Sequence, residues 1–166
     1  MGNIALWLAA RFVPGRMGMR ELQVAQARLM AEMACTIIDL DPERGRDLLR
    51  QAFSNYGRGL AEDLKPRFHP GATLSDLTAV WRAMCNLAGI RLSISQEGDR
   101  VVFEHPFCPL WEEFRRRGRF HCQETCLPMI TALSQAIAPS VEIQLARAPD
   151  SAAPCIKALS LEEERA

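Results

Sequence analysis

The sequence predicts an α+β fold in which N-terminal helices precede a four-stranded antiparallel sheet, made of two hairpins joined by a helical crossover. Two observations predict this fold. Apolar residues recur at helical steps of three and four as far as residue 89, whereas they alternate with polar residues at 90–95 and 141–145. The 166 residues, 48% of them hydrophobic, are expected to form a single domain with a helical part (1–89), a sheet-plus-helix part (90–161) and a tail (162–166).

The helical part is predicted to begin with a short amphipathic helix over 4–12 and, after a link at 16–18, a long helix whose apolar stripe ends at Leu40. Asp41 is expected to cap the next helix, with Pro42 as its first residue. That helix is predicted to stop before Pro66. A final helix over 74–88 follows the cap residue Thr73 and ends at Gly89.

Two glycines lie inside the third predicted helix, at Gly57 and Gly59. Each costs about 1 kcal/mol relative to alanine. We expect that cost to be offset by the close approach of a neighbouring helix or of a bound ligand.

The sheet-plus-helix part is predicted from alternation and turn residues. Its expected elements are a hairpin of strands 90–95 and 100–104 around the turn 97–99, a loop over 105–109, a charged helix over 110–117, a helix over 123–138, and a second hairpin of strands 141–145 and 155–161 around the turn 148–154.

Charge and hydropathy exclude several classes of protein. The 20 Lys and Arg residues balance 20 Asp and Glu residues, which argues against a nucleic-acid partner recognised through a general basic field. The apolar stretch 4–13 has about half of the ~20 residues that a membrane-spanning helix needs, and no basic residue precedes it as in a secretion signal. We therefore expect a cytoplasmic protein with no integral membrane span. The methionines at 17, 19, 30 and 33 are interpreted as core residues or as the face of a homodimer formed by the N-terminal helices.

The six cysteines divide into two groups. Cys35 and Cys85 lie within helical apolar patterns and are predicted to be packing residues. The other four fall in the last 60 residues, and without a secretion signal such clustering indicates metal binding or thiol chemistry rather than disulfides. They are Cys108, Cys122, Cys126 and Cys155.

Cys122 and Cys126 are predicted to lie four residues apart at the start of a helix, where the helix N-terminus favours the thiolate. Three interpretations of this cysteine group remain open. In the first, three or four cysteines bind zinc or an iron–sulfur cluster, with His105 or His121 as a further ligand. In the second, one thiolate is a nucleophile, a histidine assists proton transfer, and Glu124 orients the base or acts as the acid. In the third, the cysteines are buried packing residues.

Short motifs over residues 45–161 resemble the L-2-amino-thiazoline-4-carboxylic acid hydrolase-like family, which is related in layout to 4-vinyl reductase-like domains. The motifs are Tyr56-Gly57, Leu60-Ala61, Gly89-Ile90, Cys108-Pro109, the Cys122/Cys126 pair and a terminal hairpin that ends in Cys155. The resemblance implies a small α+β domain with cysteines near a pocket, and the four C-terminal cysteines match the motif positions. The chain departs from the family where Ala148–Pro154 replaces the usual Gly-Asp before Cys155.

The first functional hypothesis is a hydrolase-like enzyme that opens a small cyclic amidine or thiazoline, as the resemblance implies for the named hydrolases. Cys108 and Cys122 would then supply the thiols, and His121 and Glu124 would transfer protons. The alternative is a non-enzymatic module that binds a metal, a cluster or a small ligand, as the resemblance implies for the 4-vinyl reductase-like relatives. Both hypotheses take a small molecule or ion as the partner.

Overall fold

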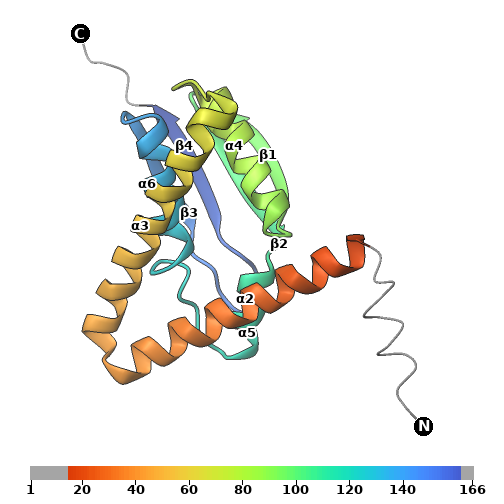
Figure 1. Cartoon of the computed structure of the whole chain (residues 1–166), viewed down its shortest axis with the longest axis vertical. Coiled ribbons are helices and arrows are strands. Elements are labelled where there is room, and N and C mark those ends of the chain that lie inside the picture. The colour runs from red at the N-terminus through yellow and green to blue at the C-terminus, as the bar shows by residue number, and fades with distance from the viewer. Residues whose placement is uncertain (1–14, 162–166) are drawn as a thin grey trace.

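The computed structural model describes residues 15–161 and confirms the predicted α+β fold (Figure 1). The predicted helix over 4–12 and the tail over 162–166 lie outside the described residues. No helix in the described part of the chain combines the length and apolar character that a bilayer crossing needs. The elements are α2 (Gly15–Leu40), α3 (Pro42–Phe68), α4 (Leu74–Leu87), β1 (Arg91–Glu97), β2 (Arg100–Phe107), α5 (Pro109–Arg116), α6 (Cys126–Ile137), β3 (Val141–Arg147) and β4 (Ile156–Leu161).

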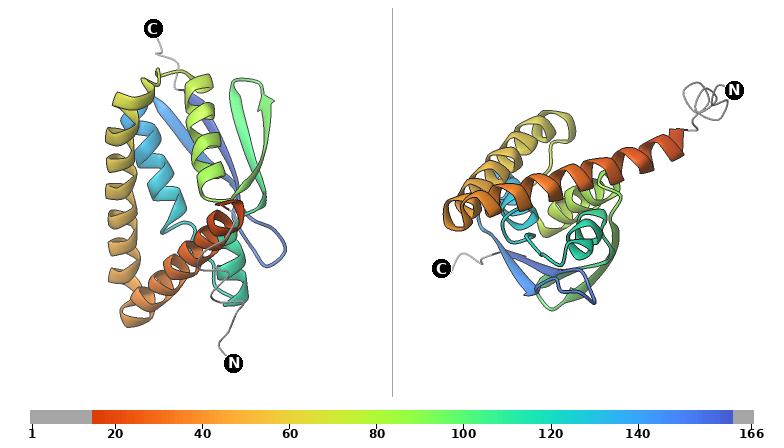
Figure 2. Two further views of the ribbon diagram at one scale, coloured as in Figure 1. Left: turned by 45° about the vertical axis from the view of Figure 1, so that its right-hand side comes forward. Right: turned by 90° about the horizontal axis from the view of Figure 1, so that it is seen from below.

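The two predicted hairpins, β1–β2 and β3–β4, form one antiparallel sheet in the order β1-β2-β4-β3. α5 and α6 connect them, as the predicted helical crossover. The helices lie on one face of this sheet, and α6 runs between α3 and the sheet (Figure 2). α2 and α5 pack together at one end of the molecule (Figure 1).

The core consists of two apolar clusters. One lies between the sheet, α4 and α6, where Trp81, Phe103, Leu133 and Leu159 are buried. The other lies between α2 and α5 and includes buried Phe114. Cys108 and Cys122 belong to this second cluster, so they are held by packing from the helical end of the fold.

Two predicted helix boundaries in the N-terminal half are wrong. α2 begins at Gly15 and includes the residues 16–18 that were predicted as a link, because extending an existing helix costs far less than starting a new one. α3 continues through Pro66 to Phe68, since a proline in the last turn removes one hydrogen bond without interrupting a longer ladder. His69, in the left-handed conformation (φ 45°, ψ 48°), ends the helix by donating its backbone N–H to the Lys65 carbonyl at 2.9 Å.

The predicted caps of α3 and α4 are confirmed. The Asp41 carboxylate accepts from the backbone N–H of Arg44 at 3.1 Å, and the Thr73 hydroxyl accepts from the backbone N–H of Asp76 at 3.1 Å. Asp76 completes the reciprocal pair by accepting from the Thr73 hydroxyl at 2.6 Å.

Of the two glycines inside α3, Gly57 meets the predicted neighbouring helix and Gly59 does not. A Cβ at position 57 would overlap the Met129 carbonyl oxygen and lie 3.1 Å from the Leu133 backbone nitrogen, both in α6. A Cβ at position 59 would meet no atom within 4 Å. Gly57 therefore sets how closely α3 approaches α6. No neighbouring helix of the described structure approaches Gly59, and the ligand alternative for Gly59 stays a prediction.

The predicted loop over 105–109 is mostly strand, because β2 continues to Phe107. A bulge between Arg91 and Ser93 lets the ladder skip Pro106, so its missing N–H leaves no bond unmade. α6 begins at Cys126 rather than at residue 123, so Cys122 lies in a turn and not in the same helix. The Thr125 hydroxyl holds this turn by donating to the His121 carbonyl at 2.7 Å.

Candidate functional site

The register of β2 against β4 brings polar side chains into the core. Phe103 is paired with Lys157, and both side chains are buried on the helix-covered face. Because every second residue of a strand shares a face, His105 and Cys155 follow on that face. The four side chains therefore lie on one inner strip of the sheet. Phe103 lies beside Lys157, and His105 lies beside Cys155.

Lys157 donates to the Cys155 sulfur, with Nζ 2.8 Å from Sγ. Lys157 is 5% exposed and Cys155 is 7% exposed, so the contact lies inside the protein. Burial disfavours the ammonium, but attraction by Cys155 and Cys126 and the hydrogen bond to Cys155 outweigh it and raise the pKa of Lys157 above its usual value. No ion pair joins Lys157 to a carboxylate within residues 15–161. The core of the described fold thus holds a lysine amino group beside a sulfur.

Five cysteines lie close enough to Lys157 to interact with it electrostatically. The cysteine–lysine cluster draws residues from five parts of the fold: α4, the end of β2, the turn before α6, α6 itself and β4. Its members are Cys85, Cys108, Cys122, Cys126, Cys155 and Lys157.

Most of these thiols resist ionisation. Burial raises the pKa of Cys85 to about 11 and of Cys126 to about 12, and it raises the pKa of Cys108 and of Cys122 above the usual value. The expectation that the α6 N-terminus would favour a thiolate is therefore wrong, because desolvation outweighs the helix dipole. At neutral pH these four cysteines are thiols.

His105 lies beside Cys155 as a neutral imidazole. Its Nδ1 is 2.9 Å from the Cys155 carbonyl oxygen, which can only accept, so Nδ1 carries the hydrogen. Burial lowers the pKa of His105 to about 4, and the nearby charge of Lys157 acts in the same direction. His105 thus fixes the start of β4 and leaves Nε2 as an acceptor.

His121 and Glu124 form a separate polar group. His121 Nδ1 lies 3.9 Å from one Glu124 carboxylate oxygen, and Arg50 of α3 binds the other at 3.3 Å. His121 Nε2 is buried without a hydrogen-bond partner in the described structure, and its ring meets Phe114 edge-on at 5.6 Å. Burial, and next the charge of Arg119, lower the pKa of His121.

The structure therefore divides the predicted catalytic residues between two groups. Cys108 and Cys122 belong to the cysteine–lysine cluster, whereas no hydrogen bond of the described residues joins His121 or Glu124 to a sulfur. The predicted ligands Cys108, Cys122, Cys126 and Cys155 do gather, but no group of three or more His, Cys, Asp or Glu side chains within 15–161 has the arrangement of a metal site.

Sequence reasoning missed Lys157 and assigned Cys85 to packing alone. Cys35 and Cys85 are both buried, as predicted. Cys85 also interacts electrostatically with Lys157, which opposes the effect of burial on the pKa of the Cys85 thiol. A signal for Lys157 was present in the predicted last strand, where it shares a face with Leu159 and Leu161. A lysine on the apolar face of a strand is rarely left without a function or a counter-charge.

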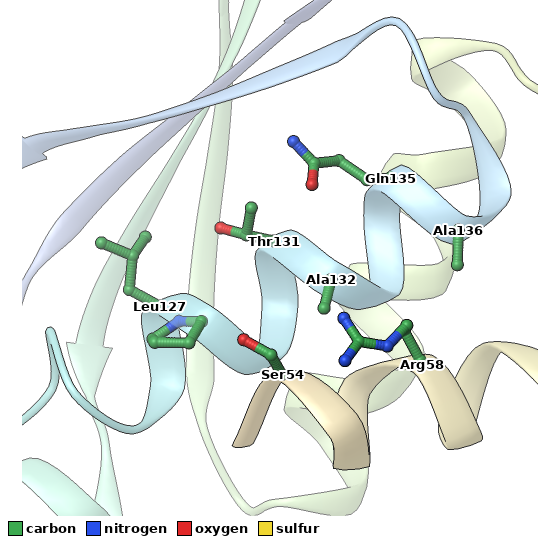
Figure 3. A pocket seen from close by; sticks show the side chains of 8 residues that line it. Ser54, Arg58, Leu127, Thr131, Ala132, Gln135 and Ala136 are labelled. Atoms are coloured by element: carbon green, nitrogen blue, oxygen red, sulfur yellow. The ribbon is translucent and has the colours of Figure 1, made fainter. Parts of the chain in front are cut away.

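A groove of about 550 Å³ runs along the seam between α3 and α6. Figure 3 shows Ser54 and Arg58 of α3 facing α6, whose Thr131 and Gln135 add polar groups to a floor of small apolar side chains. The remaining lining residues are Leu127, Pro128, Ala132 and Ala136. The groove contains none of the predicted site residues.

Comparison with known proteins finds likeness in structure alone. No family model matches the sequence, and no curated protein matches it. The fold resembles the crystal structure of the phenol-responsive sensory domain of the transcription activator PoxR with phenol, with a TM-score of 0.59 and 14% identity, over 80% of this chain and 72% of that one. It also resembles trafficking protein particle complex subunit 3 from Naegleria fowleri, covalently bound to palmitic acid, with a TM-score of 0.59 and 11% identity, over 84% of this chain and 96% of that one.

Identities this low establish a shared fold and nothing further. The fold is that of an α+β domain also found in a small-ligand sensory domain. The resemblance to the thiazoline hydrolase-like family stays a prediction.

Proposed function

We propose that this chain is a binding module that holds a small organic molecule in its interior, beside Lys157, without converting it. The observation that carries the proposal is the buried side-chain amino group of Lys157, whose acceptor in the described structure is the Cys155 sulfur. An ammonium has three N–H donors, and a buried charge without a counter-charge costs several kcal/mol. A ligand head group that accepts hydrogen bonds or carries negative charge would meet this need.

The surroundings of Lys157 suit the apolar body of such a ligand. Lys157 lies between Phe103 of β2 and Leu145 of β3 in the sheet register. Trp81 packs against Phe103 with ring centroids 4.5 Å apart and the rings tilted by 41°, and its Nε1 donates to the Ser134 hydroxyl at 2.8 Å. The expected ligand therefore has a compact apolar body and a polar or acidic head.

The two structural neighbours support this ligand class. One was crystallised with phenol and the other is covalently bound to palmitic acid, so each holds a largely apolar organic molecule. The alternative hypothesis from the sequence, a sensory or regulatory binding module, is the one that this support favours.

The hydrolase hypothesis has less support. A thiol nucleophile acts as the thiolate. Burial raises the pKa of both Cys108 and Cys122, and His121 makes no hydrogen bond to either sulfur in the described structure. Opening a thiazoline ring at this site would require a rearrangement that brings a base to a thiol.

Titration of the full chain with phenol, benzoate and octanoate, and with benzene as a probe without a head group, tests the proposal. We expect at least one probe with a head group to raise the melting temperature and to give a saturable isotherm. Lys157→Met is expected to weaken that binding at least about tenfold, which corresponds to about 1.4 kcal/mol. The variant should fold, because an apolar replacement of a buried charge is often neutral or stabilising.

Two control variants locate the ligand. Lys65→Met removes the second lysine of the chain, which is exposed, and should leave binding unchanged. Arg58→Ala should also leave binding unchanged. If Arg58→Ala abolishes binding while Lys157→Met does not, the ligand occupies the α3–α6 groove and the interior site is wrong. No binding of any probe at millimolar concentration would contradict the proposed function.

Metal binding is the second candidate, favoured by the gathering of five cysteines in one cluster. Elemental analysis of protein purified without air distinguishes it. Stoichiometric zinc or iron that is lost in the Cys122→Ala, Cys126→Ala double variant would identify a metal module instead of an organic ligand site.

A further inference from the structure

Cys155 and Lys157 place a sulfur and an amino group in direct contact inside the protein. Cys155 immediately precedes β4 and Lys157 is the second residue of that strand, so both side chains lie on the buried face of the sheet. The Lys157 Nζ is 2.8 Å from the Cys155 Sγ. A nitrogen nucleophile therefore already touches the atom with which it would form a bond.

Hydrogen bonds from both neighbouring strands fix the backbone at this end of β4. His105 of β2 donates from Nδ1 to the Cys155 carbonyl at 2.9 Å, and Arg147 of β3 donates to the Pro154 carbonyl at 3.0 Å. The sulfur and the amino group are thus held in one geometry. Two groups held together in this way react far faster than groups that meet by diffusion.

Hydrogen-bond donors distinguish Cys155 from the other members of the cysteine–lysine cluster. Lys157 donates to the Cys155 sulfur, and Nδ1 of His105 lies 3.9 Å from the same atom. Donors aimed at a sulfur stabilise the negative charge with which it attacks an oxidant. Burial raises the pKa of each of the other four thiols of the cluster, which makes them poor nucleophiles. Oxidation of the cluster should therefore begin at Cys155.

We propose that Cys155 and Lys157 form a redox modification site, at which hydrogen peroxide joins Sγ to Nζ in a reversible sulfenamide bond. The Cys155 sulfur attacks one peroxide oxygen, so that an S–O bond forms and the O–O bond breaks. The sulfur loses two electrons and the peroxide gains them. The departing hydroxide takes a proton from the pair and leaves as water, which gives a sulfenic acid beside a neutral amine.

The second step closes the cross-link. The Nζ lone pair attacks the sulfur, the S–N bond forms and the S–O bond breaks. The oxygen leaves as a second water, with a proton that the nitrogen gives up. In sum, a thiol, an amine and hydrogen peroxide give a sulfenamide and two waters.

The cross-link would change what Lys157 offers to a ligand. The modified nitrogen keeps a single N–H and carries no positive charge. In the binding module proposed above, oxidation therefore weakens the hold on the ligand head group, and a thiol reductant restores the free amine. This consequence rests on the proposed function, whereas the cross-link itself needs only the contact between Nζ and Sγ.

Peptide mapping of the full chain after treatment with hydrogen peroxide tests the cross-link. Trypsin cleaves after arginine and lysine, so the unfolded reduced chain, with its thiols blocked, gives the peptide 148–157 that ends at Lys157. We expect peroxide to abolish cleavage after Lys157 and to yield the peptide 148–165. Its mass should be about 2 Da below that of the same peptide with a free thiol and amine. Dithiothreitol should restore both the mass and the cleavage.

Two variants separate the cross-link from ordinary thiol oxidation. In Lys157→Met the sulfenic acid at Cys155 has no amine to react with, so dimedone, which labels sulfenic acids, should label Cys155 about tenfold more than in the unchanged protein. Cys126→Ser is the matched control, because it removes another thiol of the cluster and should leave the cross-link unchanged. Circular dichroism of both variants checks that the fold is retained.

Cleavage after Lys157 that persists in the oxidised protein would overturn the proposal, whether Cys155 is then unmodified, a sulfinic acid or part of a disulfide. A peptide 148–165 about 14 Da heavier than its unmodified form would indicate an oxygen bridge between sulfur and nitrogen and overturn the sulfenamide. A chain that forms the cross-link but binds neither phenol, benzoate nor octanoate would support the redox site and contradict the proposed function alone.

Discussion

Replacing Gly57 by alanine is expected to destabilise the fold by about 3 kcal/mol, whereas replacing Gly59 is expected to stabilise it slightly. The new Cβ at position 57 would overlap the Met129 carbonyl oxygen, so α3 and α6 would have to move apart along their contact. Overpacking that displaces backbone typically costs about 1–3 kcal/mol, occasionally more. Because α6 lies between α3 and the sheet, the shift would also disturb Leu133 in the main core.

Gly59→Ala is the matched control for this substitution. Position 59 has open space around its Cβ, and alanine improves helix propensity by about 0.5–1 kcal/mol. Urea unfolding of the two variants, two residues apart in one helix, separates packing from propensity. If both variants shift the midpoint in the same direction, the close contact of α3 with α6 at Gly57 is wrong.

Acidification is expected to remove about 3 kcal/mol of stability through His105 as the pH falls from about 6.5 to about 4. The folded protein holds His105 neutral with a pKa of about 4, while the unfolded chain binds a proton near the usual value of 6.5. Below that pH the unfolded state gains a proton that the folded state excludes, so stability is complete above about 6.5 and is lost toward 4.

His105→Asn isolates this contribution, because asparagine can keep a donor toward the Cys155 carbonyl without titrating. Unfolding at pH 8, where His105 is neutral in both states, measures the packing cost of the replacement. The difference in unfolding free energy between the two proteins should then shrink steadily as the pH falls. A difference that stays constant from pH 8 to pH 4 would show that His105 does not titrate abnormally.

Much of the fold was predictable because its elements follow local rules. The change from helical to alternating periodicity at Ile90 divides the helices from the sheet, and Asp41 and Thr73 start their helices where local capping requires. These boundary errors arose where one local interaction outweighs another. Proline 66 is tolerated in the last turn of α3, and the turn that carries Cys122 is held by the Thr125 hydroxyl instead of by a helix.

The candidate site was predictable in its residue types but not in its arrangement. The sequence clusters Cys108, Cys122 and Cys126, and the structure brings these cysteines together around Lys157. The structure adds Cys85 from α4 and the buried Lys157 from β4, and it separates His121 from the thiols. Strand register decides these additions, because pairing Phe103 with Lys157 fixes which polar groups face inward.

The sequence by itself determined the α+β order of elements, the two hairpins and the concentration of cysteines in the C-terminal half, because periodicity and capping act over a few residues. Only the tertiary structure decided which cysteines meet and what charge they meet. Residues from separate parts of the fold converge on Lys157, and burial there raises the pKa of Cys108, Cys122 and Cys126 and lowers that of His105. Desolvation and contact between distant segments are properties of the folded core, and no local pattern encodes them.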